Sequence, residues 1–275
     1  MGGPLVPQFY RTDASFTDEA FEVVTTRLDV DAAALRAAVA LLSDTERQRA
    51  RRFAFDRERR RFTVARARLR QLLAARLGVR PESVELNYGT HGKPVLAGRH
   101  ANTELHFNLS HSEDVAVYAL AHGRDIGIDV EAVRVLRDAD EIAARFFSHC
   151  ENQAYLALEM HDRPQGFFNC WTRKEAFVKA LGDGLSHPLD RFDVSLAPGE
   201  PARILSVDGI AADDNAWTVH SFVPWPGFIA AVVLRKIDDN SATRETPNAI
   251  FLPSQFAPHT SGFDQTSRLP ISCNP

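Results

Sequence analysis

The sequence predicts an α+β protein made of two similar α/β halves with a ligand cleft between them. Strand-like and helix-like segments follow one another in the same order twice, and 275 residues with 44% hydrophobic content can bury a sizeable core. Four marker positions recur with offsets of 104 or 105 residues: Val23, Ser43, Glu46 and Gly78, then Ile128, Ser148, Glu151 and Gly182. This period is too long for a solenoid, so we expect a duplicated unit related by a pseudo-twofold axis. Ligands favour crevices between such halves.

In the first half, the β-branched residues of "FEVVTTRLDV" (21–30) predict a strand. Ser43 stands three residues before Glu46, a capping-box pattern that predicts the start of a helix. The long basic helix "RRRFTVARARLRQLLAARLG" (59–78) should end at Gly78, because glycine suits the left-handed conformation of a helix C-terminus. Three strand-like segments follow: "SVELNYG" (83–89), "ELHFNLS" (104–110) and "VAVYALA" (115–121).

In the second half, "IGIDVEAV" (126–133) predicts a strand and "ADEIAARFFSHCENQAYLAL" (139–158) is helical. A further helix that contains "WTRKEAFVKALG" (171–182) should end at its glycine. Two more strands are expected in "WTVHSFV" (217–223) and "GFIAAVVL" (227–234). The predicted boundaries are therefore 1–122 and 123–236 for the halves.

The remaining segment, 237–275, is rich in Ser, Thr, Pro and Asn and has no sustained period, so we expect an irregular tail.

Composition excludes several classes of protein. A net charge of −4 and a pI near 6.2 argue against a protein that holds nucleic acid or an anionic membrane by bulk charge. The longest apolar run, 228–234, is far shorter than the roughly 20 residues that span a bilayer. Three cysteines cannot form a fully paired framework and show no metal-ligand spacing. We therefore expect a cytoplasmic monomer.

Two acidic residues alternate with apolar ones in "RDIGIDVEAV". A strand projects Asp129 and Glu131 from one face, where two carboxylates are suited to Mg²⁺. The alternative is a half-buried strand with one solvated face.

A narrow polar strip crosses the otherwise apolar helix around "WTRKEAFVKALG". Glu175 and Lys179 lie at i and i+4, and their apolar neighbours favour a strip that lines a crevice. A carboxylate and an ammonium there would suit a metal ion and a phosphate. The alternative is a solvated surface ion pair worth a few tenths of a kcal/mol.

Two loop regions carry weaker signals. Ser110 and His111 stand where a strand leads into a turn, and could hold a phosphate or a base edge. Lys93 lies in "GTHGKP", which lacks the spacing of a Walker loop. Either region could also be purely structural. We find no G-x-S-x-G, H-E-x-x-H, C-x-x-C or dinucleotide-binding glycine pattern, so phosphoryl-transfer chemistry without an NTPase loop remains.

Five motifs in order resemble the signature of the Sfp-type 4′-phosphopantetheinyl transferases: "GKP" (92–94), "FNLSHS" (107–112), "IGIDVE" (126–131), "RFFSHCE" (145–151) and "WTRKEAFVKALGDGL" (171–185). The likeness covers roughly residues 20–235. It implies a pseudo-dimer of two α/β halves with coenzyme A between them. It also implies Mg²⁺-dependent transfer of the 4′-phosphopantetheine arm of coenzyme A to a serine of an acyl, peptidyl or aryl carrier protein, with release of 3′,5′-ADP.

By this resemblance, Asp129 and Glu131 bind Mg²⁺, and Glu175 stands at or beside the ion. Glu151 is either part of the metal shell or the general base, and Lys179 contacts the pyrophosphate.

The resemblance also implies the coenzyme A contacts. Lys93, Ser110 and His111 hold the phosphates and the nucleotide. Arg49 and Arg52 are the candidates for the 3′-phosphate.

The expected activity is that of a holo-[acyl-carrier-protein] synthase. Polyketide and nonribosomal peptide synthases are the favoured recipients, with fatty-acid or lysine-pathway carriers as alternatives. Two other functions stay open: a coenzyme A-binding protein without catalysis, and a Mg²⁺-dependent nucleotide phosphohydrolase.

Overall fold

The computed structural model describes residues 21–89, 92–182, 188–212 and 216–236. The predicted tail 237–275, and the Thr90 and His91 part of the "GTHGKP" loop, lie outside the described residues. Within these ranges no helix is both long and apolar enough to cross a bilayer.

The first half contains one three-stranded antiparallel sheet of order β1-β5-β4 and a small β2-β3 hairpin. Its elements are β1 (Phe21–Arg27), α1 (Ala32–Leu41), α2 (Asp44–Arg51), α3 (Asp56–Leu77), η1 (Pro81–Ser83), β2 (Leu86–Tyr88), β3 (Pro94–Leu96), η2 (Gly98–His100), β4 (Leu105–Ser112) and β5 (Val115–His122).

The second half contains a three-stranded sheet of order β10-β11-β6 and a smaller β7-β8-β9 sheet. Its elements are β6 (Ile126–Ala132), α4 (Ala139–Phe146), α5 (His149–Leu156), α6 (Arg163–Leu181), η4 (Leu189–Arg191), β7 (Phe192–Val194), β8 (Ile204–Val207), β9 (Ile210–Ala211), β10 (Trp217–Phe222) and β11 (Phe228–Arg235).

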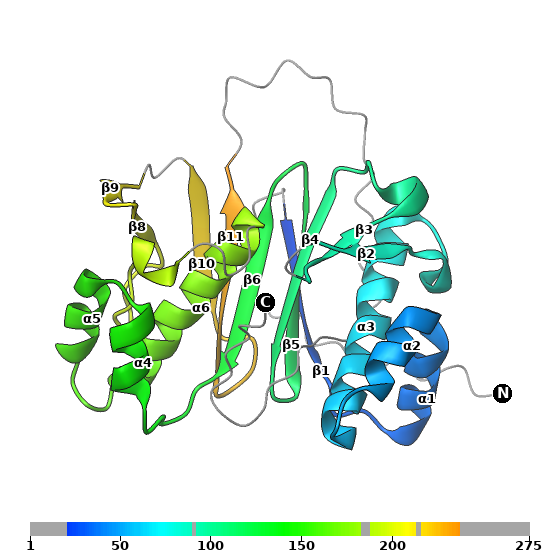
Figure 1. Cartoon of the computed structure of the whole chain (residues 1–275), viewed down its shortest axis with the longest axis horizontal. Coiled ribbons are helices and arrows are strands. Elements are labelled where there is room, and N and C mark those ends of the chain that lie inside the picture. Colours follow the sequence, from blue (N-terminus) through cyan, green and yellow to red (C-terminus); the bar gives the residue numbers. More distant parts are fainter. Residues whose placement is uncertain (1–20, 90–91, 183–187, 213–215, 237–275) are drawn as a thin grey trace, which may run out of the picture.

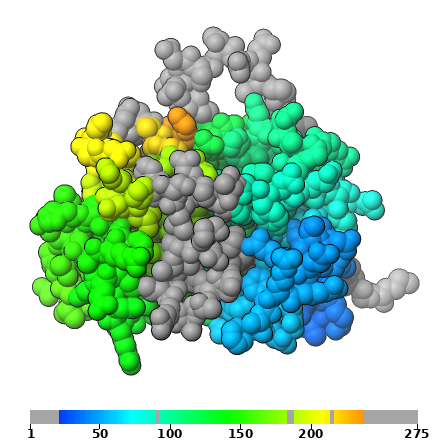
Figure 2. Space-filling model, viewed as in Figure 1, coloured from blue at the N-terminus to red at the C-terminus, as the bar shows by residue number. Residues whose placement is uncertain are grey.

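The order of elements repeats, as the marker positions predicted. Each half runs from a strand through three helices to a 3-10 turn and short strands, and its first strand then pairs with its last. Ser43 and Ser148 both N-cap a helix through a capping box. Gly78 and Gly182 both end the long helix in the left-handed conformation. The two halves form adjoining lobes, coloured from blue to green for the first and from green to orange for the second (Figures 1 and 2).

The two main sheets share an apolar core. Val117 and Ala119 of β5 pack in one cluster with Ile128 and Val130 of β6 and with Val232 of β11. The long helices cover other faces: α3 packs against β4 and β5, and α6 packs against β6 and β11 (Figure 1). The alternation predicted for β6 is thus confirmed, since its apolar residues enter the shared core.

Helix α6 approaches β6 most closely at Gly127. A Cβ atom on this residue would lie 2.0 Å from the Ala176 carbonyl oxygen and 2.4 Å from the Ala180 nitrogen. These are backbone atoms of α6 and cannot move without moving the helix. The absence of a side chain at Gly127 therefore sets the distance between α6 and the acidic strand β6.

We predict that Gly127→Ala lowers the free energy of unfolding by about 3 kcal/mol, because the added methyl group overpacks this contact. Gly123→Ala is the control: its φ of +64° costs about 1 kcal/mol as alanine, but its Cβ would meet nothing within 4 Å. Urea denaturation measures both. Equal losses in the two variants would contradict close packing at Gly127.

Candidate active site

The halves meet where residues 108–112 of β4 face residues 128–132 of β6, a junction we call the seam. The two strands belong to different sheets, and side chains of β4 bond to β6 instead. Asn108 Oδ1 accepts a hydrogen bond from the Ile128 nitrogen at 2.9 Å, and Ser110 Oγ donates to Asp129 Oδ1 at 2.6 Å. The first half therefore orients an acidic side chain of the second.

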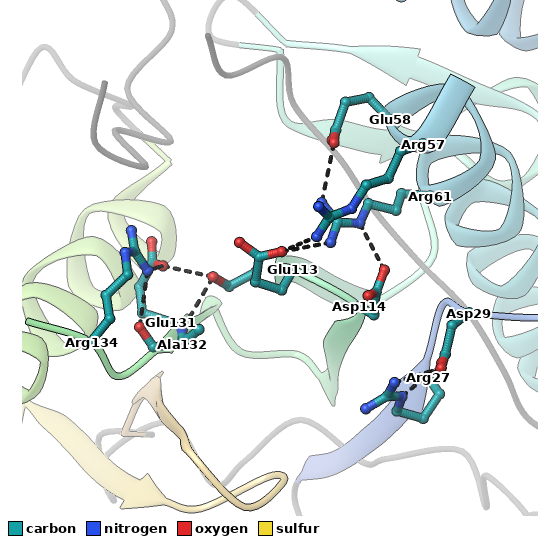
Figure 3. A network of polar contacts seen from close by, with 11 residues as sticks. Arg27, Asp29, Arg57, Glu58, Arg61, Glu113, Asp114, Glu131, Ala132 and Arg134 are labelled. Atoms are coloured by element: carbon teal, nitrogen blue, oxygen red, sulfur yellow. Dashed lines mark hydrogen bonds and ion pairs between the residues drawn. The ribbon is translucent and has the colours of Figure 1, made fainter. Parts of the chain in front are cut away.

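The same pattern repeats two residues further along the seam. Ser112 Oγ donates to Glu131 Oε2 at 2.8 Å and accepts from the Ala132 nitrogen at 3.1 Å. Close by, Arg134 donates to the Ala132 oxygen at 2.9 Å and lies 3.9 Å from Glu131 Oε2 (Figure 3). Glu131 is thereby held by groups from both halves.

An ion-pair network ties α3 to this end of the seam. Arg61 donates to Glu113 Oε2 at 2.7 Å and to Asp114 Oδ1 at 2.9 Å, in the turn between β4 and β5. Arg57 also pairs with Glu113 (Figure 3). These contacts fix the turn from which Ser112 reaches across the seam.

The two acidic residues of β6 are buried side by side. Asp129 is 0% and Glu131 is 2% exposed. Burial, followed by the negative charge of Asp129, raises the pKa of Glu131 well above its usual range. Asp129 Oδ2 has no hydrogen-bond partner among the described residues. Buried carboxylates with an unsatisfied oxygen fit a site for a cation, and oxygen ligands suit Mg²⁺.

Lys179 of α6 is the cation that reaches this site. Its Nζ lies 2.6 Å from Asp129 Oδ1 and donates to Ser110 Oγ at 3.2 Å. Burial alone would lower the pKa of Lys179, but the charges of Asp129, Glu175 and Glu131 outweigh it and raise the pKa. The polar strip predicted on this helix therefore faces the seam.

Glu175, one turn before Lys179, is 3% exposed. It is near enough to Lys179 for its charge to contribute to the raised pKa of the lysine. In the part of the chain that the structure describes, however, no three His, Cys, Asp or Glu side chains are arranged as a metal-binding group. The predicted ligands Asp129, Glu131 and Glu175 surround one region without forming such a group.

Lys93 belongs to the first half, and its side chain bonds to the second half. Its Nζ donates to the carbonyl oxygen of Lys179 at 2.6 Å and to that of Ile126 at 3.4 Å. Burial lowers the pKa of Lys93 to about 8. The loop that precedes β3 is thus anchored to the end of α6, and two lysines lie at the same end of the seam.

A second cationic cluster lies on α2 and α3. The guanidinium groups of Arg49 and Arg66 both lie 5.5 Å from the ring centre of Tyr88. Burial, reinforced by the charge of Arg66, lowers the pKa of Arg49. Arg52 is exposed at the end of α2, near enough for its charge to act on Arg49 in the same direction.

Arg66 was missed by the sequence analysis. It is 2% exposed, yet its Nε and Nη1 atoms have no hydrogen-bond partner among the described residues, and the oxygen Oε1 of Glu46 is 3.7 Å from Nε. The only signal was the "ARARLR" repeat, which a solvated helix face also explains. An unsatisfied buried guanidinium beside another arginine is a geometry suited to a phosphate.

Glu151 lies away from these groups, at the start of α5. Its Oε2 accepts from the Ser148 nitrogen and from Lys174 Nζ, both at 2.7 Å. Its Oε1 accepts from the Val194 nitrogen at 2.7 Å. Both oxygens are therefore engaged with groups of the second half.

Fold and site together define a two-half α+β protein with buried acids and cations where the halves meet, and comparisons with known proteins give its family. The profile of the 4′-phosphopantetheinyl transferase superfamily matches residues 125–233, and that of the N-terminal region of 4′-phosphopantetheinyl transferase matches residues 30–122. The transferase HetI of a Nostoc species is 39% identical over 207 residues, which cover 75% of this chain and 84% of HetI.

Two further relatives are more distant. Sfp of Bacillus subtilis is 30% identical over 158 residues, 58% of this chain and 68% of Sfp. The human L-aminoadipate-semialdehyde dehydrogenase-phosphopantetheinyl transferase is 29% identical over 226 residues, 77% of this chain and 72% of the human protein. The chain belongs to the 4′-phosphopantetheinyl transferase superfamily, which confirms the resemblance read from its motifs.

His111, on β4 beside Ser110, gives a pH prediction. Burial lowers the pKa of His111 to about 4 from 6.5, so the unfolded chain binds more protons between these values and stability falls as the pH falls through this window. When the pH falls from 6.5 to 4.5, the free energy of unfolding should decrease by about 2 kcal/mol less for His111→Gln than for the unsubstituted protein. Urea titrations along the pH series measure this difference, and parallel curves would refute a neutral His111 in the folded protein.

Proposed function

We propose that this protein transfers the 4′-phosphopantetheine arm of coenzyme A to a serine of a carrier protein, leaving holo-carrier and 3′,5′-ADP, with Mg²⁺ as cofactor. Family membership supports the type of reaction. The observation that carries the assignment is the pairing of buried Asp129 on β6 with Lys179 on α6, at the junction of the two halves. A site of both charges there suits a metal ion bound together with a pyrophosphate.

Asp129 and Glu131 would hold Mg²⁺, with Glu175 beside it. The fit rests on the buried acid pair and on the unsatisfied Asp129 Oδ2 among the described residues. When bound, Mg²⁺ supplies neutralisation of pyrophosphate charge. Ser110 and Ser112 orient the two β6 carboxylates through their hydrogen bonds.

The cations at the seam would bind coenzyme A. Lys179 and Lys93 would hold the pyrophosphate, and neutral His111, with Ser110, would contact the nucleotide. In the transfer, a bond forms between the carrier serine oxygen and the phosphorus that bears pantetheine, while the bond from that phosphorus to the bridging oxygen breaks. Lys179 would stabilise the charge on the departing 3′,5′-ADP.

Glu175 would accept the serine proton, because it lies on the face of α6 that also bears Lys179. The 3′-phosphate would lie at Arg49 and Arg66, with Arg52 at the edge. Arg66 was not among the residues proposed from the sequence; it is a buried cation whose Nε and Nη1 have no hydrogen-bond partner among the described residues.

The recipients we propose are carriers of polyketide or nonribosomal peptide synthases, with a holo-[acyl-carrier-protein] synthase type of activity. We propose a cytoplasmic monomer in which residues 1–122 and 123–236 form the two halves. No observation in the structure favours a nucleotide phosphohydrolase or an inactive coenzyme A-binding protein.

The direct test incubates several apo-carrier proteins with coenzyme A, Mg²⁺ and the enzyme, and follows intact mass. A gain of one phosphopantetheine is expected, and Asp129→Asn should slow it by about 100-fold or more with the fold retained. Asp208→Asn, the same change in an exposed turn, is the control. Release of 3′,5′-ADP without a carrier would indicate hydrolysis instead, and undiminished labelling by Asp129→Asn would refute the assignment of the metal site.

A second prediction concerns the 3′-phosphate. Arg66→Met should raise KM for coenzyme A by about 10- to 100-fold, because charged hydrogen bonds to the phosphate are lost. It should leave KM for dephospho-coenzyme A, which lacks this phosphate, nearly unchanged. Without ligand, Tm should change little, because Arg70 still pairs with Glu46 when the charge of Arg66 is removed. Equal KM increases for both substrates would place the 3′-phosphate elsewhere.

A further inference from the structure

Lys174, the residue before Glu175, is fully buried on α6 although it carries a charge. Its Nζ lies 2.7 Å from Glu151 Oε2 and donates to the carbonyl oxygens of Leu189, at 2.7 Å, and Phe192. It also lies 4.2 Å from the ring centre of Phe192. The ammonium group is therefore satisfied within the second half.

Glu151 completes this arrangement from the other side. Its carboxylate is 2% exposed and bonds to the Ser148 nitrogen at the start of α5 and the Val194 nitrogen on β7. The pair thus joins α5, α6, η4 and β7. Both oxygens of Glu151 thus bond to groups of the second half, so the fold fixes the position of this carboxylate.

The first half contains a similar arrangement, in which the acid, Glu46, also lies 3.7 Å from a second cation, Arg66. Arg70 Nε lies 2.7 Å from Glu46 Oε2, and Arg70 Nη1 donates to the carbonyl oxygens of Pro81 and Val84 at 3.0 and 2.9 Å. Glu46 also caps α2 by accepting from the Ser43 nitrogen at 2.8 Å.

The two arrangements correspond in detail. In each half the cation bonds to the first residue of a 3-10 turn, η1 or η4, and to the residue just after it. The first-half helix bears Gln71 and Ala75, 104 positions before Glu175 and Lys179. An acid-cation pair that persists in the half without these catalytic candidates serves the architecture of the unit.

The position of Lys174 on α6 links this architecture to the reaction. Successive helix residues are rotated by 100°, so Lys174 points toward α5 and η4 while Glu175 lies on a neighbouring face. Another face, at Ala176 and Ala180, rests on Gly127. Rotation of α6 would separate Lys174 from Glu151 and leave two buried charges unpaired, which is strongly unfavourable. The pair and the glycine contact together fix the direction of Glu175 and Lys179.

We propose that Glu151 and Lys174 are positioning residues that fix the rotation of α6 and so aim Glu175 and Lys179 at the seam, and that Glu46 and Arg70 are the same device in the first half. The predicted effect of Glu151 and Lys174 on catalysis rests on the proposed transferase function. The predicted coupling between their two charges in stability does not depend on that function.

The test is a double-mutant cycle of Glu151→Gln, Lys174→Met and the double variant. The Tm of each variant is measured first, and the carrier-labelling kinetics are then measured at a temperature well below every Tm. Each single variant should lose about 10 °C in Tm, because one buried charge is left unpaired. Each should also lose about tenfold or more in kcat, with KM for coenzyme A unchanged. The double variant should recover most of both losses.

Three outcomes would overturn the proposal. If Tm recovers in the double variant while kcat stays about 100-fold low, Glu151 takes part in the chemistry. If the losses in Tm simply add, or the double variant does not fold, the charges are not coupled. If the single variants lose Tm but keep kcat, the pair is structural without positioning the site.

Two controls separate these causes. Glu175→Gln should lower kcat without lowering Tm, and adding Lys174→Met should not restore it. The corresponding pair Glu46→Gln and Arg70→Met, followed by Tm alone, should show a smaller recovery in its double variant, because Arg66 also loses its ion-pair partner Glu46. An unsubstituted protein that labels no carrier would refute the proposed function, but the Tm cycle would still test the charge coupling.

Discussion

Two sheets meet at the edges of β4 and β6, and polar side chains bridge them there. Asn108, Ser110 and Ser112 supply the bonds across the seam, while the shared apolar core packs β1 and β5 of one half against β6 and β11 of the other. The requirement to satisfy buried polar groups explains why serines of one half face acids of the other. Burial of Asp129 and Glu131 is still unfavourable in free energy. Buried carboxylates of this kind are typical of functional sites, where they can attract cations.

The two halves share an order of elements, and their long helices differ in the charged side chains that they carry. Both halves keep the same element order, helix caps and buried acid-cation pair. The long helix of the second half carries Glu175 and Lys179, whereas that of the first carries Arg66 near the Tyr88 ring. In the function we propose, the second half holds the reacting phosphates and the first holds the nucleotide end of coenzyme A. Neither half alone would bind the whole molecule.

Local sequence patterns were sufficient to predict many of the elements and part of the candidate site. The caps at Ser43 and Ser148 and the alternation around Asp129 depend on neighbours in sequence, so they could be read directly. The partners of Lys174 and the unsatisfied Arg66 could not, because α3 and α6 are buried on several faces and lose a clear amphipathic period. Lys93 donates to a carbonyl 86 residues away, and only the packing of the halves determines that contact.

The central claim is that one ligand binds across the seam and uses both halves. A crystal structure of the protein with coenzyme A and Mg²⁺ tests it most directly. The account predicts phosphate oxygens within hydrogen-bond distance of Lys93 or Ser110 from the first half and of Lys179 from the second. Coenzyme A bound entirely to one half, with Lys179 still paired to Asp129 and no phosphate beside it, would contradict the account.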